Sequence, residues 1–520
     1  MKQFTRWIAL TAIVCLLFSV IGCNFVLERE VVRTEVLGTS TSAADPETDS
    51  TTDVVADPDA STTGVVGGQT TGGQQTTGGG QQTTGGGQQT TNRVTTTTKK
   101  PAETRTEAPL SGKLELQIFT NESQSADGGW TNVINNFEDL TGVSVTAQIG
   151  SSVNTMMSNR WKKDNPPDMI WLDGSGIPDK QYETSGKFYD LTEVYENGYV
   201  WGTTDRIKDV VNANLVSTGS SDKLYRLPVL MTAGGVWYDA RFLKEKIGWA
   251  NPPLNYDELL KLGKDAKAKG YSTFTYPGIY SSYALSNVIA PAVAAYGQGY
   301  LNQWLSGSAA AVKDARFKSI MQRFADFCRT DGYLMEGSTT MDHTSTQQRW
   351  INHATVLIAN GLWLPDETRK LWSKKSFDMT WSTSPLIQKN QKQTIILSGK
   401  RVAVATKAKN RENALAFVRF LFREDSQNYL MYSFGYMGVR TDMPFDTAVF
   451  IQEGGGSDPT RATATALDYV NSSRVVRTYW DESWGTLGDE IALEINELAM
   501  KGGKSVQASI DRLASVAPKK

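Results

Sequence analysis

The chain has 520 residues, which is enough for two domains or for one large domain with appendages. Its formal net charge is −2, so nothing in the charge balance indicates a nucleic-acid partner. Histidine occurs only at His343 and His353, which argues against histidine-based metal sites and histidine-dependent catalytic triads.

The first residues have the features of a secretory signal. Lys2 and Arg6 give a positive start, and the apolar run over 8–18 is too short to span a bilayer comfortably. The run leads through small residues to Cys23, which resembles the lipobox of bacterial lipoproteins. We therefore expect residues 1–22 to be a signal peptide and Cys23 to carry acyl chains such as palmitate. The alternative is an ordinary secretory signal in which Cys23 is incidental.

Cysteine usage excludes a disulfide framework in the mature chain. Cys15 would leave with the signal and Cys23 would carry lipid, so only Cys328 remains. No intramolecular disulfide can then form, and the fold must be held by its apolar core.

A long tether is expected between the lipidated cysteine and the folded part, over residues 23–112. Thr, Gly, Gln, Ser and Asp dominate it, and a unit close to "GGGQQTT" recurs between Gly72 and Thr91. The repeat carries no apolar residues at heptad positions, so it does not predict a coiled coil. Such a low-complexity segment lacks the residues that build a core.

Regular structure is expected from about Lys113. Apolar residues alternate over 114–118, then fall at helical spacing over 130–140, where Gly142 can end the helix. Alternation returns over 143–149. A strand, a helix and a strand in this order predict a parallel pair with a right-handed crossover.

The later segments continue the same mixture. A short strand is expected at 169–172, and Asn255 with Glu258 predicts a capped helix that Gly270 ends. Further helices are expected near 410–422 and 485–500. Residues 113–520 therefore predict an α/β fold, and their number favours two lobes over one compact core.

Six stretches, in the right order, resemble landmarks of the family 1 extracellular solute-binding proteins, whose members include maltose-binding protein and many sugar-binding lipoproteins. The resemblance covers nearly all of residues 113–520. It depends on all six stretches occurring in this order, because each stretch alone is a weak signal. The stretches are "NPPDMIWLDG" (165–174), "KLYRLPVLMTAGGVWYDARFL" (223–243), "NPPLNYDELLKLGKDAKAKG" (251–270), "WINHATVLIANGLW" (350–363), "KNRENALAFVRFLFREDSQNYL" (409–430) and "GYMGVRTDM" (435–443).

The resemblance implies a periplasmic-binding-protein-like fold of two α/β lobes joined by a hinge, with the ligand in the cleft. It assigns 113–231 and 384–432 to the first lobe, and 235–382 and 438–520 to the second. The chain would cross between lobes near 232–234, 382–384 and 435–437.

The same resemblance points to Trp363, in "IANGLW", as a residue that stacks on a sugar ring beyond the end of a strand. The C–H face of a pyranose suits the face of an indole. Gly361 would let the chain turn sharply so that the ring faces the cleft. The alternative is that Trp363 covers the core of the second lobe.

Polar ligand groups are also expected, because sugar hydroxyls need fixed donors and acceptors. Glu122, after the first strand, and Asp173, after the strand at 169–172, are candidate carboxylates. Thr232, at a predicted crossing, could present its hydroxyl. The alternatives are solvated loop residues for the two carboxylates and hinge packing for the threonine.

Further aromatic candidates follow from positions at which members of the family place rings. They are Tyr280 and Tyr283 in "YPGIYSSYALSN", and Tyr436 at a crossing. In "TYWDESW", either Trp480 or Trp484 would close the cleft, and the other would pack in the core.

The predicted function is that of a substrate-binding protein of an ABC importer, which captures a sugar or oligosaccharide and delivers it to permease subunits. We expect a lipid-anchored monomer on the extracellular face of a Gram-positive-type cell membrane, without enzymatic activity, cofactor, metal ion or nucleic acid. Two alternatives remain. One is a surface glycoside hydrolase using 366–367 or 481–482. The other is a sensory or adhesive carbohydrate-binding lipoprotein without a transporter.

Overall fold

The computed structural model describes residues 103–120, 124–173, 177–218, 222–372, 376–443, 458–472, 474–480 and 485–517. The chain divides into residues 1–93 and 94–520, and everything described here belongs to the second unit. Cys23 and the predicted tether up to residue 102 lie outside the described residues.

The described strands form one sheet in which the order is β2-β1-β3-β8-β4-β6-β5. In addition, β7 and β9 pair with β4, and β10 pairs with β8. The strands are β1 (Lys113–Ile118), β2 (Ser144–Ile149), β3 (Met169–Leu172), β4 (Leu227–Asp239), β5 (Ser272–Thr275), β6 (Thr355–Gly361), β7 (Met379–Ser382), β8 (Thr394–Val404), β9 (Met437–Gly438) and β10 (Val476–Trp480).

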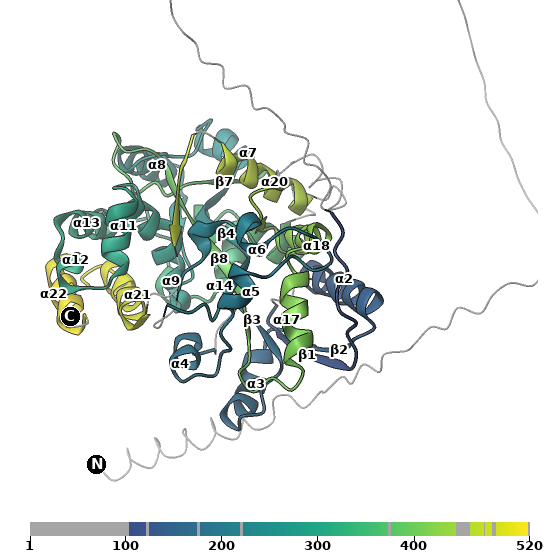
Figure 1. Ribbon diagram of the computed structural model, residues 1–520. Helices are drawn as coiled ribbons and strands as arrows, with labels where there is room; N and C mark the ends of the chain where they lie inside the picture. The colour runs from purple at the N-terminus through teal and green to yellow at the C-terminus, as the bar shows by residue number, and fades with distance from the viewer. Residues whose placement is uncertain are drawn as a thin grey trace, which may run out of the picture. The chain divides into compact units, whose positions relative to one another are not determined.

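Helices surround this sheet, as Figure 1 shows. The longer ones are α2 (Gln124–Thr141), α3 (Val153–Lys162), α8 (Tyr256–Ala268), α11 (Gln298–Leu305), α13 (Ala315–Arg329), α14 (His343–Ile351), α17 (Arg411–Phe420), α18 (Glu424–Phe434), α20 (Asp458–Asn471), α21 (Gly485–Ala499) and α22 (Val506–Val516). The shorter α-helices are α4 (Asp179–Thr184), α5 (Thr192–Glu196), α6 (Ile207–Val210), α7 (Ala240–Phe242), α9 (Ser282–Ala284), α10 (Ala290–Ala294), α12 (Ala309–Lys313), α15 (Leu364–Glu367) and α16 (Arg369–Trp372). The remaining turns are η1 (Ala213–Leu215), η3 (Gly278–Tyr280) and η5 (Ser338–Thr340), which are 3₁₀, and η2 (Leu243–Ile247) and η4 (Leu285–Ile289), which are π-helical.

The first predicted unit is confirmed. Strands β1 and β2 are parallel, with Lys113 opposite Ser144, and α2 connects them. Helix α2 ends at Thr141, and Gly142 adopts φ +72°, the left-handed conformation that glycine tolerates at a helix end. Helix α18 packs against α2, which brings a segment from the C-terminal part of the chain onto this unit.

The predicted cap of α8 is also confirmed. The Asn255 side chain accepts a hydrogen bond from the Glu258 backbone N–H, and the Glu258 carboxylate accepts one from the Leu254 N–H. This reciprocal arrangement satisfies backbone donors that have no partner within the helix. Gly270, at φ +82°, follows the end of the helix.

Strand β4 runs through two parts of the sheet. From Leu227 to Ala233 it pairs with β8, and from Gly234 to Tyr238 it pairs with β6. We call the part with β2, β1, β3 and β8 the first lobe, and the part with β6, β5 and β7 the second lobe. The change of partner falls at the residues where the sequence predicts a crossing.

The sequence predicts that the chain returns to the first lobe near residues 382–384, but in the structure it returns later. Leu386 and Ile387 are buried in the apolar core of the second lobe, and the Arg323 guanidinium of α13 donates to the Leu386 carbonyl. The chain therefore stays with the second lobe beyond residue 384. Strand β10, which the sequence assigns to the second lobe, pairs with β8 instead. Local periodicity carries no information about which strand a segment will pair with.

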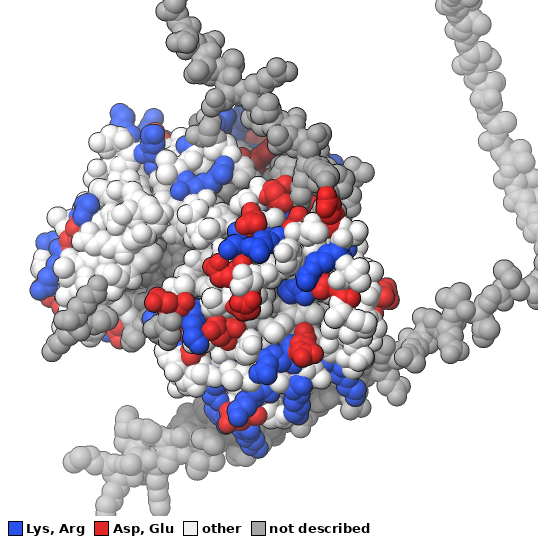
Figure 2. Space-filling model, viewed as in Figure 1, with Lys and Arg blue, Asp and Glu red and all other residues white. Residues whose placement is uncertain are grey.

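On the face shown in Figure 2, the two lobes differ in how many charged side chains they present. In the view of Figure 2, Lys, Arg, Asp and Glu side chains crowd the surface around α4, α5 and α17 of the first lobe. The surface over α9 and α11 of the second lobe is almost free of them. Within the part of the chain that the structure describes, no helix is both long and apolar enough to cross a membrane.

Ordered contacts begin before the first strand, whereas the sequence predicts that structure begins near Lys113. Thr104 bridges to Thr203, and the Glu107 carboxylate accepts hydrogen bonds from Arg419 and from the Gly202 N–H. Burial alone would raise the pKa of Glu107, but these hydrogen bonds outweigh it and lower the pKa below its ordinary value.

We therefore predict that a chain truncated to begin at Glu103 melts at the temperature of the mature chain, and that one beginning at Lys113 melts lower. A carboxyl group with a lowered folded-state pKa stabilises the fold above its unfolded pKa of about 4.3, and this stabilisation is lost as the pH falls through the folded pKa. The difference in melting temperature between the two truncated chains should therefore become smaller at acidic pH. Calorimetric melting at about pH 7, and at the lowest pH below about 4 at which both chains still fold reversibly, measures this difference in melting temperature. Equal melting at neutral pH would show that the Glu107 contacts contribute nothing.

Candidate functional site

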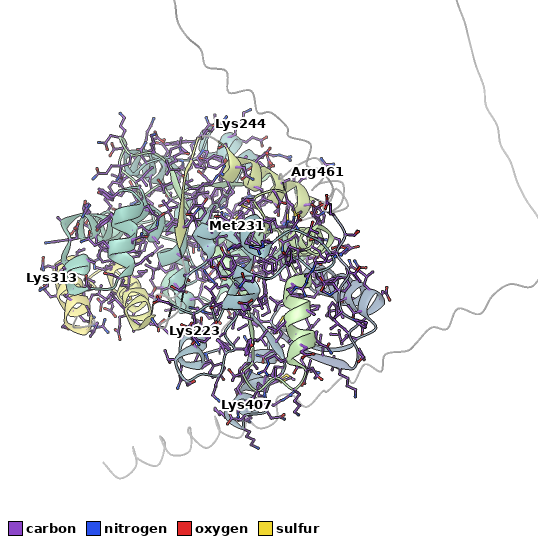
Figure 3. The ribbon with its side chains drawn as sticks, in the orientation of Figure 1. Lys223, Met231, Lys244, Lys313, Lys407 and Arg461 are labelled. Atoms are coloured by element: carbon purple, nitrogen blue, oxygen red, sulfur yellow. The ribbon has the colours of Figure 1, made fainter. Side chains whose placement is uncertain are left out.

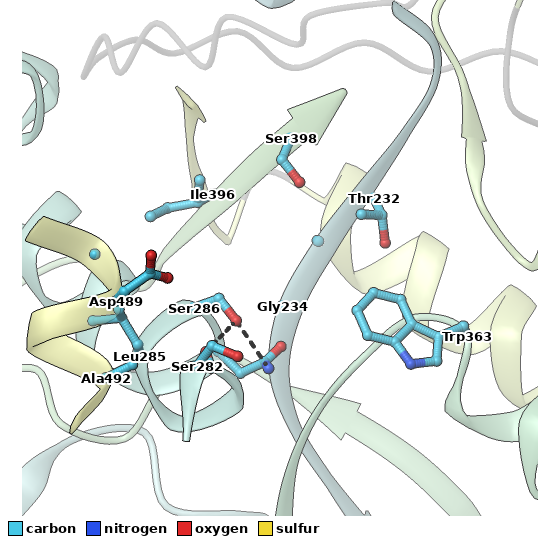
Figure 4. A pocket seen from close by; sticks show the side chains of 13 residues that line it. Thr232, Gly234, Ser282, Leu285, Ser286, Trp363, Ile396, Ser398, Asp489 and Ala492 are labelled. Atoms are coloured by element: carbon cyan, nitrogen blue, oxygen red, sulfur yellow. Dashed lines mark hydrogen bonds between the residues drawn. The ribbon is translucent and has the colours of Figure 1, made fainter. Parts of the chain in front are cut away.

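A cavity of about 310 Å³ opens where β4 passes from one lobe to the other. Strands β4 and β8, the turns α9 and η4, the segment after β6, and helix α21 all contribute to its wall. The lining residues are Thr232, Ala233, Gly234, Ser282, Leu285, Ser286, Asn287, Trp363, Ile396, Ser398, Gly488, Asp489 and Ala492. In Figure 4, Thr232 and Trp363 face Ser282, Ser286 and Asp489 across the cavity.

Figure 3 places this region in the molecule. Met231, the residue before Thr232, lies near the centre of the view on β4, whereas the exposed cations Lys244, Lys313 and Lys407 lie at the periphery. The cavity is thus built on the strand that connects the lobes.

One wall depends on a close approach between η4 and β4. A Cβ atom on Gly234 would lie 2.3 Å from Oδ1 of Asn287, so only glycine fits there. The Asn287 side chain is buried, and its amide donates to the Tyr283 carbonyl over 2.8 Å. Helix η4 is a π-helix, a form that occurs frequently at functional sites.

Trp363 lies on the cavity wall just beyond the end of β6, as the sequence predicts, and it is half-buried. The role of Gly361 differs from the expected sharp turn. A Cβ atom there would lie 2.0 Å from Cζ3 of Trp363, so the glycine is needed because the indole folds back over the backbone. The Trp237 indole donates to the Gly361 carbonyl over 2.8 Å and fixes the strand end.

Two tyrosines from the predicted set hold the Trp363 ring. Tyr283 and Tyr436 each lie 6.2 Å from it, centroid to centroid, with an interplanar angle of 85°. Such edge-to-face contacts are favourable. Burial raises the pKa of the Tyr283 hydroxyl, while a hydrogen bond with the Trp363 side chain acts to lower it. The indole is therefore held on more than one side.

Asp173 and Lys400 form an ion pair next to these rings. The Lys400 ammonium lies 3.0 Å from Oδ1 of Asp173, 5.6 Å from the centre of the Trp363 ring and 5.9 Å from that of Tyr436. Sequence reasoning found Asp173 and missed Lys400. The available signal was a pair of basic residues, Lys400 and Arg401, inside a strand-like run, "TIILSGKRVAV", that is apolar at both ends and wholly buried.

Thr232 presents a buried polar atom that has no hydrogen-bond partner among the residues placed by the structure. The residue is 3% exposed, and its Oγ1 makes no hydrogen bond to any described residue. A buried hydroxyl without a partner is costly. Thr232 lines the cavity, so its hydroxyl is placed where a group that enters the cavity would meet it.

The sequence pattern of the family described as bacterial extracellular solute-binding protein matches this chain over residues 121–428. The chain belongs to this family. The resemblance inferred from the six stretches is thereby confirmed, and members of the family are binding proteins.

Among curated proteins, this solute-binding protein is similar to the diacetylchitobiose binding protein NgcE of Streptomyces coelicolor. The two are 26% identical over 246 residues, which are 46% of this chain and 50% of NgcE. The match thus spans about half the length of the curated relative.

Solved structures show the same fold. RafE of Streptococcus pneumoniae in complex with raffinose superposes with a TM-score of 0.59 at 18% identity, covering 77% of this chain and 98% of RafE. A solute-binding protein from Thermotoga lettingae bound with alpha-D-tagatose gives 0.58 at 15% identity, covering 78% and 98%. The predicted two-lobed α/β fold is confirmed.

The structure does not bring every predicted residue of the solute-binding protein to this cavity. Tyr280 is 43% exposed and lies 5.6 Å from the ring of His343, outside the lining set. Glu122 and Trp484 lie outside the described residues, as does the side chain of Trp480.

The carboxylates invoked for a hydrolase at 366–367 have protein partners. Asp366 pairs with Arg369 over 2.6 Å, and Glu367 accepts a hydrogen bond from Gln347 over 2.7 Å. Burial raises the pKa of Glu367. Neither residue lines the cavity. The second pair, 481–482, lies outside the described residues.

Several lining residues were not anticipated from the sequence. Ser282, Ser286 and Asn287 belong to an apolar-rich segment, "YSSYALSNVIA", and Asp489 belongs to the amphipathic helix α21. Serine and asparagine in such a segment have many local explanations, including hydrogen bonds to their own backbone. These residues can be identified as lining residues only from the tertiary structure, in which η4, α21 and β4 pack around the same cavity.

Proposed function

We propose that this protein captures a neutral sugar or oligosaccharide in the cavity beside Trp363 and delivers it to the permease subunits of an ABC importer. The observation that carries the proposal is the immobilised indole of Trp363 on a wall that also presents several hydroxyl groups, an amide and a few apolar side chains. A pyranose offers C–H faces to an aromatic ring and hydroxyls to such groups. The orphaned Thr232 hydroxyl supports the same reading.

Residues of both lobes line the cavity, which supports capture by closure. Ser398 belongs to β8 of the first lobe, and Trp363 and Asn287 belong to the second. A ligand that contacts both lobes binds the closed arrangement better than the open one and shifts the population toward it. The permease would then recognise the closed, loaded form.

The charges around the cavity favour a neutral ligand. Among the described residues that line the cavity, Asp489 is the only charged one, and the ammonium of Lys400 is already paired with Asp173. An anionic sugar would meet the Asp489 carboxylate without a lining cation to offset the repulsion. We expect neutral sugars to bind more tightly than uronic acids of the same size.

Isothermal titration calorimetry with neutral mono- and oligosaccharides, and with matched uronic acids, tests the proposal. We expect saturable binding of at least one neutral sugar and a higher melting temperature in its presence. Absence of binding across the panel would contradict the proposal. Release of shorter products from an oligosaccharide would instead indicate a hydrolase.

We further propose that Cys23 anchors the protein to the outer face of the membrane, which rests on the lipobox-like sequence. Cys23→Ser should release the mature protein into the medium or leave the signal uncleaved. Metabolic labelling with a fatty-acid analogue measures the change. Labelling equal to that of the unaltered protein would rule out this anchor.

A further inference from the structure

Lys400 is a buried cation that the proposed function does not yet explain. It is 8% exposed and lies in β8, in which each of the 11 residues is buried. Removing an ammonium group from water is unfavourable unless the protein supplies partners. A strand of this kind has no need of a lysine for its core, so the partners of Lys400 indicate its role.

The first partner, Asp173, is held by a chain of buried and partly buried hydrogen bonds in the first lobe. The Trp161 indole donates to Gln117, the Gln117 amide donates to Asn154, and the Asn154 amide donates to the backbone carbonyl of Asp173. Each of these three bonds is 2.9 Å long. The segment that carries the Asp173 carboxylate is therefore fixed by the core, and it fixes the ammonium of Lys400 in turn.

The second partner is the face of an aromatic ring. The ammonium lies 5.6 Å from the centre of the Trp363 ring, within the range of a cation–π interaction. Trp363 lines the cavity and Lys400 does not. Lys400 belongs to a first-lobe strand and Trp363 to a second-lobe segment, so the contact also spans the two lobes.

We propose that Lys400, held by Asp173, is a positioning residue that fixes the Trp363 indole at the angle in which it receives the ligand. The proposal rests on the proposed sugar-binding function. Lys400 acts on affinity through the ring, because its ammonium contacts the ring from outside the cavity lining. Asp173 then contributes in the same way, so we infer that it acts on the ligand indirectly, through Lys400, whereas the sequence predicts a direct contact.

A double-mutant cycle separates this role from a direct contact. The variants are Lys400→Met, which keeps the length and removes the charge, Lys400→Arg, which keeps a cation, and each of these combined with Trp363→Ala. Calorimetry with N,N′-diacetylchitobiose and raffinose gives the affinities. We expect Lys400→Met to weaken binding about fivefold to tenfold in the presence of Trp363 and less than about twofold in its absence, with partial rescue by Lys400→Arg.

A second experiment needs no ligand, so it tests the positioning role even if neither of the two sugars binds. The fluorescence of Trp363 is obtained as the difference between proteins with tryptophan and with phenylalanine at that position. Lys400→Met and Asp173→Asn should both change its emission and its quenching by acrylamide. Lys407→Met, an exposed lysine of the first lobe, is the control and should change neither.

Two results would overturn the proposal. An equal loss of affinity with and without Trp363 would mean that Lys400 contacts the sugar itself. A fall in melting temperature with unchanged Trp363 fluorescence would mean that the ion pair only stabilises the fold. Absence of sugar binding together with the expected fluorescence change would contradict the proposed function and leave the positioning role supported.

Discussion

Replacing Trp363 with alanine should weaken sugar binding about thirtyfold, which corresponds to about 2 kcal/mol or more. Of the lining residues that the structure describes, Trp363 alone is aromatic, and its indole is held by Tyr283, Tyr436 and the Gly361 backbone. A rigid aromatic side chain loses little conformational entropy when the ligand binds. Little of the free energy of its contacts with the ligand is therefore offset, and most of it contributes to the affinity.

The effect of Trp363→Ala on stability should be smaller than that of removing a core tryptophan. Trp363 is half-buried beside the cavity, whereas large-to-small changes in a closed core cost about 3–5 kcal/mol. Calorimetric titration and thermal melting on one variant measure both effects.

Trp249→Ala is a matched control for this variant. Trp249 is also half-buried, and its indole donates to Asp265 over 2.9 Å, but it does not line the cavity. It should lower the melting temperature without changing the affinity. If Trp363→Ala behaves in the same way, Trp363 is a packing residue and the site is elsewhere.

Gly361→Ala should weaken binding about tenfold or more and destabilise the fold by about 1–3 kcal/mol, the usual cost of overpacking. A Cβ atom at this position would lie 2.0 Å from Cζ3 and 2.3 Å from Cη2 of Trp363. The strand end is fixed by its hydrogen bond to Trp237, so the indole must move. A displaced ring no longer presents the same face to the ligand.

The same substitution should have a much smaller effect when Trp363 is already alanine, because the three atoms nearest to the added Cβ all belong to the Trp363 ring. Affinity and melting temperature of both single variants and of the double variant measure this coupling. Gly299→Ala is the control, since a Cβ atom there has no neighbour within 4 Å. Additive effects of Gly361→Ala and Trp363→Ala would refute the close approach as the reason for the glycine.

Local sequence patterns determined much of the secondary structure. The alternation of β1, the helical spacing of α2, and the left-handed Gly142 that follows it were all predicted and confirmed. The Asn255 cap is of the same kind, since its partner Glu258 lies three residues away. These features depend on residues within one or two turns of each other, and local propensity decides such cases. The place of Trp363 just beyond β6 was likewise evident from the sequence.

Only the tertiary structure decided which side chains from distant parts of the sequence meet. Asp173 and Lys400 are 227 residues apart in sequence, and Glu107 and Arg419 are 312 apart. A local pattern can mark a charged residue as buried, as it does for Lys400, but it does not say which distant residue carries the opposite charge. No spacing rule therefore predicts these pairs. The approach of Asn287 to Gly234 is decided in the same way, because only the packing of η4 on β4 brings the two together. The sequence determined which segments form strands and helices, and the burial of their apolar faces against one another determined which side chains meet at the cavity.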